Sequence, residues 1–191
     1  MRIIAGKYRR RTVKTLRGLA LRPSSDRLRE TLFNILGAAV EGSVFVDLYA
    51  GSGAIGIEAL SRGAREVIFI EKNPAAVRLI RRNLESLGIA GSAEILAADA
   101  IRGLERLVGR RFGSHPHSDF VFLDPPYALR GEYERALEFL DRSPLLTPEG
   151  RVIVEHPRRL ALPESLTQLE RVRVVEQGDT ALSFYRLAIA A

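Results

Sequence analysis

Three observations predict an α/β fold with a mainly parallel sheet and helices on both faces. Short apolar runs alternate with segments of helical period from residue 44 onward, which is the pattern of parallel strands joined by helices. A glycine-rich turn follows the first apolar run, with Gly51, Gly53 and Gly56 in the spacing G-x-G-x-x-G. Acidic residues end four of the predicted strands, and ligands bind beyond the carboxyl ends of the strands in such sheets.

Two elements precede this alternation. Residues 1–21 alternate polar and apolar side chains, which predicts two or three short strands, with a hairpin of residues 3–5 and 12–16. A helix follows, preceded by Pro23, capped by a serine at position 24 or 25 and ended by a glycine at position 37 or 42. The apolar stripe that predicts this helix consists of Leu28, Leu32, Ile35 and Leu36.

From residue 44 the predicted strands are 44–48, 66–70, 93–97, 119–123 and 151–155, and the predicted helices are 54–62, 74–87, 100–107 and 132–141. Two further β-like runs, 171–176 and 181–188, flank a polar turn and predict an antiparallel hairpin that closes the sheet edge. Because no linker-like segment interrupts the chain, we expect one domain over residues 1–191. Within it, residues 1–42 form a basic arm and a helix, and residues 43–191 form the sheet.

Composition excludes several kinds of protein. A hydrophobic content of 46% and a charged content of 27% are ordinary for a globular chain. No apolar run reaches the length of a membrane span and the N-terminus lacks the apolar core of a signal peptide, which predicts a cytoplasmic protein. Without cysteine the chain has no disulfide, thiolate zinc site or cysteine nucleophile, and its three histidines do not indicate a metal centre.

Positive charge is concentrated at the N-terminus. Residues 1–30 carry ten Lys or Arg and two acidic residues, a net charge of +8. The remaining residues carry 19 basic and 21 acidic side chains, a net charge of −2. This asymmetry indicates a segment that faces a polyanion, and a solvated basic surface is the alternative.

The glycine turn and the acids around it fit a nucleoside cofactor. Asp47 lies inside the first strand, where a buried carboxylate is costly unless something pairs with it. Glu71 comes 20 residues after Gly51, at the end of the second strand, and its two oxygens can accept both hydroxyls of a ribose. Asp99 follows the third strand and either accepts from the amine of adenine or caps the next helix.

The tetrapeptide Asp124-Pro125-Pro126-Tyr127 follows the fourth strand and indicates the kind of substrate on which the cofactor is used. Its two prolines fix the backbone and remove two N–H donors, which leaves carbonyls and a carboxylate directed the same way. A planar amine with two N–H donors is the complementary ligand, and Tyr127 offers a face on which a flat base can stack. A dinucleotide dehydrogenase would use the glycine turn and the acid but would not explain this tetrapeptide.

These motifs resemble those of the class I S-adenosylmethionine-dependent methyltransferases, whose amine-methylating branch carries an Asp/Asn-Pro-Pro-Tyr/Phe motif. More closely, the chain resembles the bacterial small-subunit ribosomal RNA guanine-N2 methyltransferases, which modify a single guanine of 16S rRNA. The block at 22–34 is the most discriminating, because general amine methyltransferases are not expected to share it. The likeness runs nearly end to end, over residues 1–6, 22–34, 47–53, 124–127 and 178–185.

The resemblance implies a Rossmann-like class I methyltransferase: a seven-stranded, mainly parallel sheet with an antiparallel last strand and a small N-terminal extension. It implies S-adenosyl-L-methionine as the cofactor, with its methionine part at the turn, its ribose at Glu71 and its adenine at Asp99. The implied cofactor-binding residues are Asp47, Tyr49, Ala50, Gly51, Gly53, Glu71, Asp99 and Ala100. The implied catalytic residues are Asp124, Pro125, Pro126 and Tyr127, of which Asp124 and the Pro125 carbonyl bind the guanine N2 amine.

The expected partner is 16S rRNA, either free or within a partly or fully assembled small ribosomal subunit, with no membrane and no metal. The base must lie in a loop or be flipped out of its helix. Two departures from the family pattern are Arg10, where a glycine is expected, and an enlarged loop at 109–118. The expected RNA-binding residues are Arg9, Arg10, Arg11, Lys14, Arg22, Arg27 and Arg29.

Two alternatives stay open. An adenine-N6 methyltransferase would use the same tetrapeptide on a different amine, although no target-recognition domain for a DNA site is evident. A non-catalytic RNA-binding module that retains the fold is the second alternative. The intact tetrapeptide and glycine turn argue against this second alternative.

Overall fold

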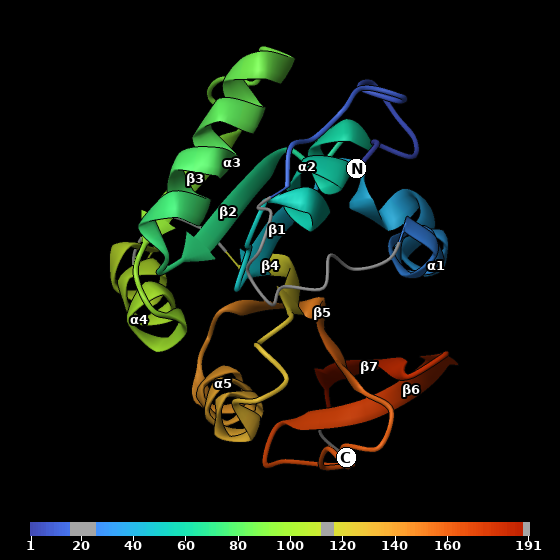
Figure 1. Ribbon diagram of the computed structural model, residues 1–191. Helices are drawn as coiled ribbons and strands as arrows, with labels where there is room; N and C mark the ends of the chain where they lie inside the picture. The colour runs from blue at the N-terminus through green and yellow to red at the C-terminus, as the bar shows by residue number, and fades with distance from the viewer. Residues whose placement is uncertain (16–25, 112–116, 189–191) are drawn as a thin grey trace.

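The computed structural model describes residues 1–15, 26–111 and 117–188. Its described residues form one seven-stranded sheet in the order β3-β2-β1-β4-β5-β7-β6 (Figure 1). Neighbouring strands from β3 to β5 are parallel, whereas β7 pairs antiparallel with both β5 and β6. The predicted sheet and terminal hairpin are therefore confirmed. The strands are β1 Val44–Leu48, β2 Glu66–Glu71, β3 Ala93–Ala97, β4 Ser118–Leu123, β5 Leu146–Pro157, β6 Leu169–Gln177 and β7 Thr180–Leu187.

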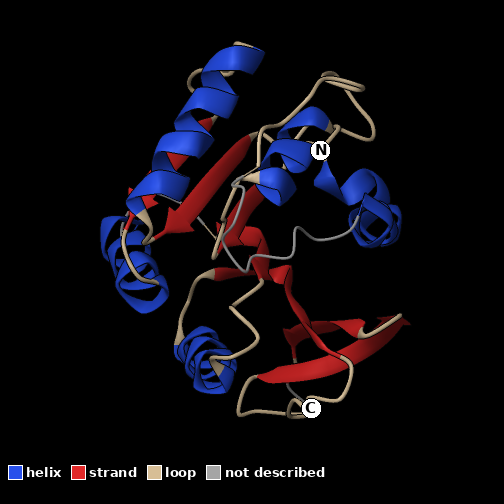
Figure 2. Ribbon diagram, in the orientation of Figure 1, coloured by secondary structure: helices blue, strands red, loops and turns tan. Residues whose placement is uncertain are grey.

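Helices cover both faces of the sheet (Figure 2). One apolar cluster joins α1, α2, α3 and the N-terminal arm to one face, and a second cluster joins α4 and α5 to the other. Covered on both sides, β1 is buried along its whole length, which explains its unbroken apolar run except at Asp47. The helices are α1 Asp26–Leu36, the 3-10 helix η1 Gly37–Val40, α2 Ala54–Ser61, α3 Pro74–Leu87, α4 Ala100–Arg111 and α5 Arg130–Arg142.

Local signals fix several boundaries where they were predicted. The Asn73 side chain accepts from the backbone N–H groups of Ala75 and Ala76, at 2.8 and 3.3 Å, and so caps α3. Pro74 occupies the first turn and Gly88, with φ +70°, ends the helix. Since a glycine in a left-handed conformation follows both α1 and α3, these two ends could be predicted from the sequence.

The N-terminal arm, residues 1–15, differs from its prediction. Within the described residues the two segments predicted as strands, 3–5 and 12–16, pair antiparallel near Arg2 and Thr12, but neither forms a full strand. The Ile3 N–H donates to the Arg11 carbonyl at 3.0 Å, and the Val13 N–H donates to the Met1 carbonyl at 2.9 Å. The arm also packs on α2, where Glu58 accepts from the backbone N–H groups of Ile4 and Ala5, at 2.9 and 3.0 Å. The pairing between the two segments is therefore short, and beyond it the Glu58 side chain binds the backbone of the first segment.

Other differences are smaller. The helix α4 continues to Arg111, beyond the predicted end at 107, and β5 begins at Leu146 rather than 151. The predicted serine cap of α1 and residues 112–116 of the predicted loop at 109–118 lie outside the described residues, whereas residues 109–111 of that loop belong to α4. No helix in the described part of the chain is long and apolar enough to cross a membrane.

Candidate active site

The turn after β1 is held in an unusual backbone conformation. Tyr49, Gly51 and Gly53 all have positive φ, at +63°, +55° and +78°. Glycine adopts this region readily, whereas an aromatic residue rarely does. The Ala50 N–H donates to the Ile70 carbonyl at 3.1 Å, which fastens the turn to β2. The predicted cofactor turn is thus a compact loop, in which Ala50, Gly51 and Gly53 are buried and Tyr49 is half-buried.

Glu71, at the end of β2, supports this turn. Its Oε2 accepts from the Gly51 N–H at 2.8 Å, and its Oε1 accepts from the Asn73 N–H at 2.7 Å. Each carboxylate oxygen has two lone pairs, so each keeps one for a further donor. Glu71 can therefore hold the turn and accept two hydroxyl groups at once, which fits the predicted ribose contact.

Asp47 organises the start of α2. It is buried, and its Oδ2 accepts from the Gly56 N–H at 2.9 Å. Burial raises the pKa of Asp47 to about 8, an effect that the Gly56 N–H partly offsets and the Glu71 charge enhances. Gly56 is itself required for close packing, because an added Cβ would lie 2.3 Å from the Phe69 ring. Asp47 thereby positions the turn and helix, and its contact with a cofactor stays a prediction.

The cap predicted as one alternative for Asp99 is confirmed. Its Oδ1 accepts from the Arg102 N–H at 3.1 Å, in the first turn of α4, and its side chain is 44% exposed. The neighbouring Ala100 is buried. A cap uses one lone pair of the carboxylate, so the adenine contact is compatible with it and remains a prediction.

The tetrapeptide follows β4, whose neighbour in the sheet is β1. The Asp124 N–H donates to the Leu48 carbonyl at 3.5 Å, which joins the two strand ends. Burial raises the pKa of Asp124 well above its usual range, and the negative charges of Glu155 and Asp47 add to this effect. The Pro125 carbonyl accepts from the Tyr133 hydroxyl at 3.2 Å, while Pro126 is exposed.

Tyr127 is half-buried and reaches the turn between β6 and β7. Its hydroxyl lies 3.1 Å from the Thr180 hydroxyl, and either can donate. This contact fixes one end of the side chain while the residue stays partly exposed. The ring predicted to stack on a base is therefore held by the C-terminal hairpin.

Four residues that contact this site were not predicted. Glu155 lies buried near the end of β5, and its position resembles that of Asp47 and Asp124, so the same strand-end criterion could have found it. Glu132 and Tyr133 lie in the first turns of α5 and Thr180 begins β7. Glu132 and Thr180 contact side chains 83 and 53 residues away, and Tyr133 contacts the Pro125 carbonyl eight residues earlier; no sequence motif marks these three residues.

The predicted RNA-binding residues differ in their exposure and in the contacts that their side chains make. The side chains of Arg9, Arg10, Lys14 and Arg27 are exposed. Arg10 has φ +69°, which explains why a glycine is expected at this position. Arg11 donates to the carbonyls of Ser86 and Leu87 at the end of α3, at 2.5 and 3.4 Å, and Arg22 lies outside the described residues.

Arg29 corrects the prediction. It is 1% exposed, and its guanidinium donates to the Arg2 carbonyl at 2.7 Å and contacts the Met1 sulfur and the Asp26 carboxylate. Its Nε lies 3.7 Å from Glu58, the residue that holds the arm. A buried guanidinium engaged in this way cannot reach a phosphate, so Arg29 anchors the arm to α1 and α2.

The strand order, with β7 inserted antiparallel between β5 and β6, and the turn and tetrapeptide at adjacent strand ends define a Rossmann-like class I methyltransferase. This is the class that the sequence motifs predicted. The family model described as conserved hypothetical protein 95 matches residues 1–186, and the chain belongs to this family.

Relatives and solved structures agree over nearly the full length. The chain is 35% identical over 190 residues to ribosomal RNA small subunit methyltransferase D of Haemophilus influenzae, covering 98% of this chain and 92% of that protein. Its namesake from Escherichia coli K12 is 34% identical over 186 residues, with 97% and 89% covered. The solved structure of the Escherichia coli protein yhhF has a TM-score of 0.82 at 31% identity, with 98% and 97% covered. That of a hypothetical protein from Thermus thermophilus has a TM-score of 0.77 at 30% identity, with 96% and 98% covered.

Proposed function

We propose that the protein transfers a methyl group from S-adenosyl-L-methionine to the exocyclic N2 amine of a guanine in 16S ribosomal RNA. One observation carries the proposal: the tetrapeptide from Asp124 to Tyr127 lies at the end of β4, directly beside the glycine turn at the end of β1. The names of the Haemophilus and Escherichia relatives support rRNA as the substrate.

The residues at the ends of β1 and β2 fit the cofactor. The glycines of the turn allow its backbone to approach a ligand closely, and Glu71 keeps one lone pair on each oxygen for the ribose hydroxyls. Asp99 caps α4 through Oδ1, and its Oδ2, which lies 3.6 Å from the Arg102 guanidinium, has a lone pair left to accept from an adenine amine. When bound there, S-adenosyl-L-methionine supplies a methyl group on a reactive sulfonium, so the chain itself has mainly to position the amine.

The tetrapeptide provides acceptors for that amine. A guanine N2 group has two N–H donors, and Asp124 with the Pro125 carbonyl supplies two acceptors. The carbonyl has two lone pairs, so the bond from Tyr133 leaves one for the base. Because the N2 lone pair is delocalised into the ring, hydrogen bonds from N2 to acceptors help to localise it toward the methyl donor. Tyr127 then stacks on the base.

Asp124 is the proton acceptor in this proposal. A methylated amine must lose a proton, and a general base works best when its pKa lies near the working pH. Burial and the charges of Glu155 and Asp47 raise the pKa of Asp124 and make its carboxylate more basic. The proton passes from N2 to Asp124 directly or through one water molecule.

RNA is held by the exposed basic side chains of the arm and of α1, which contact phosphates on either side of a flipped guanine. Such contacts orient the RNA without reading its bases. Arg9, Arg10, Lys14 and Arg27 form this group.

Nucleoside analysis tests the proposal. Purified protein is incubated with labelled S-adenosyl-L-methionine and either unmodified 16S rRNA or small ribosomal subunits that lack the modification. Digestion and mass spectrometry should show N2-methylguanosine with wild-type protein and none with Asp124→Ala. N6-methyladenosine would contradict the guanine assignment. Cofactor binding without methylation of either substrate would support the non-catalytic alternative.

A further inference from the structure

Two consecutive residues at the start of α5 contact two different parts of the proposed site. The Glu132 Oε2 accepts from the Tyr49 hydroxyl at 2.9 Å, and Tyr49 belongs to the cofactor turn. The Tyr133 hydroxyl donates to the Pro125 carbonyl at 3.2 Å, and Pro125 belongs to the tetrapeptide. One helix end therefore touches both the residues expected to bind the cofactor and those expected to bind the base.

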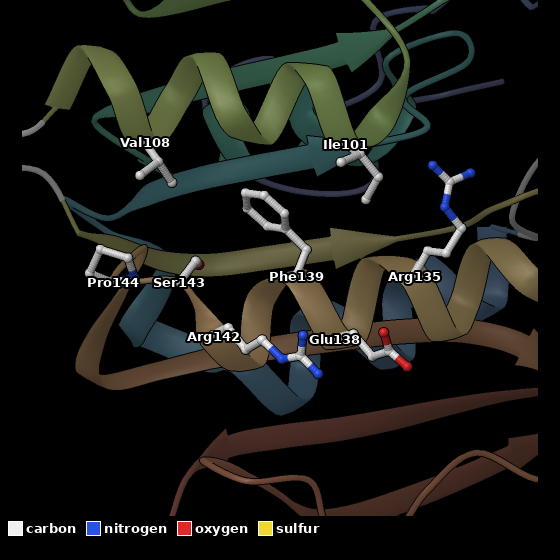
Figure 3. A pocket seen from close by; sticks show the side chains of 8 residues that line it. All are labelled: Ile101, Val108, Arg135, Glu138, Phe139, Arg142, Ser143 and Pro144. Atoms are coloured by element: carbon white, nitrogen blue, oxygen red, sulfur yellow. The ribbon is translucent and has the colours of Figure 1, made fainter.

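The topology explains this double contact. Because β4 lies beside β1 and α5 follows β4 after a short loop, the start of α5 lies next to both strand ends. The other Glu132 oxygen accepts from Arg135 at 2.9 Å, which restrains the carboxylate. Figure 3 shows Arg135 near Ile101, a residue of the first turn of α4, at one end of a groove between α4 and α5.

The contact with Glu132 holds a backbone conformation that the sequence does not favour. Tyr49 has φ +63°, a region rarely occupied by aromatic residues, and such outliers persist only where surrounding contacts impose them. If the hydroxyl were released, Tyr49 could move to negative φ and redirect the backbone of Ala50 and Gly51. The population of molecules able to bind the cofactor would then fall, and the apparent affinity would fall with it.

The second contact acts on the base side. Tyr133 is fully buried, and burial together with the Asp124 carboxylate raises the pKa of its hydroxyl, so the hydroxyl remains a donor. By occupying one lone pair of the Pro125 carbonyl, it fixes the direction of the other. A carbonyl free to rotate would meet the amine less often in the reactive orientation.

We propose that Glu132 and Tyr133 are positioning residues with separate duties: Glu132 holds the cofactor turn through Tyr49, and Tyr133 holds the base-binding carbonyl of Pro125. The inference rests on the proposed function. It goes beyond that function because neither residue belongs to the glycine turn, the strand-end acids or the tetrapeptide.

Cofactor titration tests the first duty. Calorimetry with S-adenosyl-L-methionine should show Glu132→Ala and Tyr49→Phe each weakening affinity by roughly tenfold, the loss expected for a hydrogen bond to a charged group. The double variant should be no weaker than either single variant, because both remove the same bond. Glu132→Gln keeps an acceptor and should restore part of the affinity. Glu138→Ala, an exposed position on the same helix, is the matched control and should bind as wild type.

Single-turnover kinetics test the second duty. Tyr133→Phe removes only the hydroxyl and should lower the methylation rate at saturating substrates by roughly tenfold or more, with cofactor affinity unchanged. Thermal unfolding of each variant checks that the fold is intact. If a variant unfolds, Glu132→Gln and Tyr133→Phe remain the informative pair, since each deletes little volume.

The outcomes separate this inference from the proposed function. Failure of wild-type protein to bind the cofactor or to methylate a guanine would overturn the function. Wild-type methylation with unchanged affinity in Glu132→Ala, or an unchanged rate in Tyr133→Phe, would overturn the positioning roles alone. Equal loss of affinity and rate in both variants would also contradict the division of duties.

Discussion

The two halves of the sheet use the same kind of side chain in different ways. In the half formed by β1, β2 and β3, the carboxylates of Asp47 and Glu71 accept from backbone N–H groups of the turns that they support. In the half that starts at β4, burial raises the pKa of Asp124, and the charge of the buried Glu155 from β5 raises it further. In the proposed mechanism the first pair forms a rigid part of the cofactor site, whereas burial, with the charges of Glu155 and Asp47, makes Asp124 more basic.

The largest effect should follow loss of the base-binding carboxylate. Asp124→Ala should lower turnover by roughly 10³-fold or more, because it removes both an acceptor for the amine and the proton acceptor. Asp124→Asn keeps an acceptor and should retain some activity. Methyl incorporation into 16S rRNA measures the activity of both variants. Turnover near the wild-type rate in Asp124→Ala would contradict a catalytic role for the half of the sheet that starts at β4.

The second prediction concerns the N-terminal arm, which packs on α2 beside the cofactor half of the sheet but is expected to bind RNA. Replacing Arg9 by Ala and Arg10 by Gly should weaken RNA binding and lower the slope of log affinity against log salt by about 0.7 for each lost phosphate contact. Stability should not fall, because Gly suits the positive φ at position 10.

Two exposed arginines on the opposite helical layer, Arg106 and Arg142, provide the control for this prediction. Their double replacement by Ala removes the same charge and should leave the salt dependence closer to wild type. Cofactor affinity should not move in either variant. An unchanged slope in the arm variant would mean that the arm is a solvated surface.

The third prediction concerns pH. In the proposed mechanism Asp124 accepts a proton and must be ionised, so activity should rise with pH through its raised pKa. Asp124 is faced by Glu155 from β5, Asp47 from β1 and Tyr133 from α5. Glu155→Gln removes one negative charge, lowers the pKa of Asp124 and should shift the acidic limb of the rate profile to lower pH. A profile that stays in place would show that Glu155 does not tune the base.

The smallest effect concerns stability in the cofactor half. The pKa of Asp47 is about 8 in the folded protein and 3.8 as its ordinary value, so the folded state holds a proton that the unfolded state releases. This contribution is complete below pH 3.8 and is lost as pH rises through about 8. Asp47→Asn should therefore raise the melting temperature more at about pH 8 than at about pH 5. Equal shifts at both values would contradict a buried, protonated Asp47.

The sequence predicts those parts of the fold that depend on local signals. The bounds of β1 and α3 agree because an apolar run, the Asn73 cap and Gly88 act within a few residues of the boundary they set. The strand-end positions of Asp47, Glu71 and Asp124 could likewise be predicted as parts of one site, because the topology brings the carboxyl ends of parallel strands to one edge of the sheet.

The rest depends on contacts between distant residues. The N-terminal hairpin is shorter than predicted, and the backbone N–H groups of Ile4 and Ala5 bind Glu58, which lies 54 and 53 residues away in the sequence. Arg29 is buried for a related reason: its partners, Arg2 and Glu58, come from elements far from α1 in the sequence. The duties of Glu132 also require knowing that Tyr49 lies beside α5, which no local pattern reveals.

The most direct test measures cofactor affinity after removing one carboxylate from each half of the sheet. It asks whether the first half binds the cofactor and the second does not. S-adenosyl-L-methionine is titrated by calorimetry into wild-type protein, Glu71→Ala and Asp124→Ala. We predict that Glu71→Ala weakens binding by roughly 1.5–3 kcal/mol, the value of a hydrogen bond to a charged group, while Asp124→Ala stays within a few-fold of wild type. Unchanged affinity in Glu71→Ala, or a loss of orders of magnitude in Asp124→Ala, would contradict the assignment of the two halves.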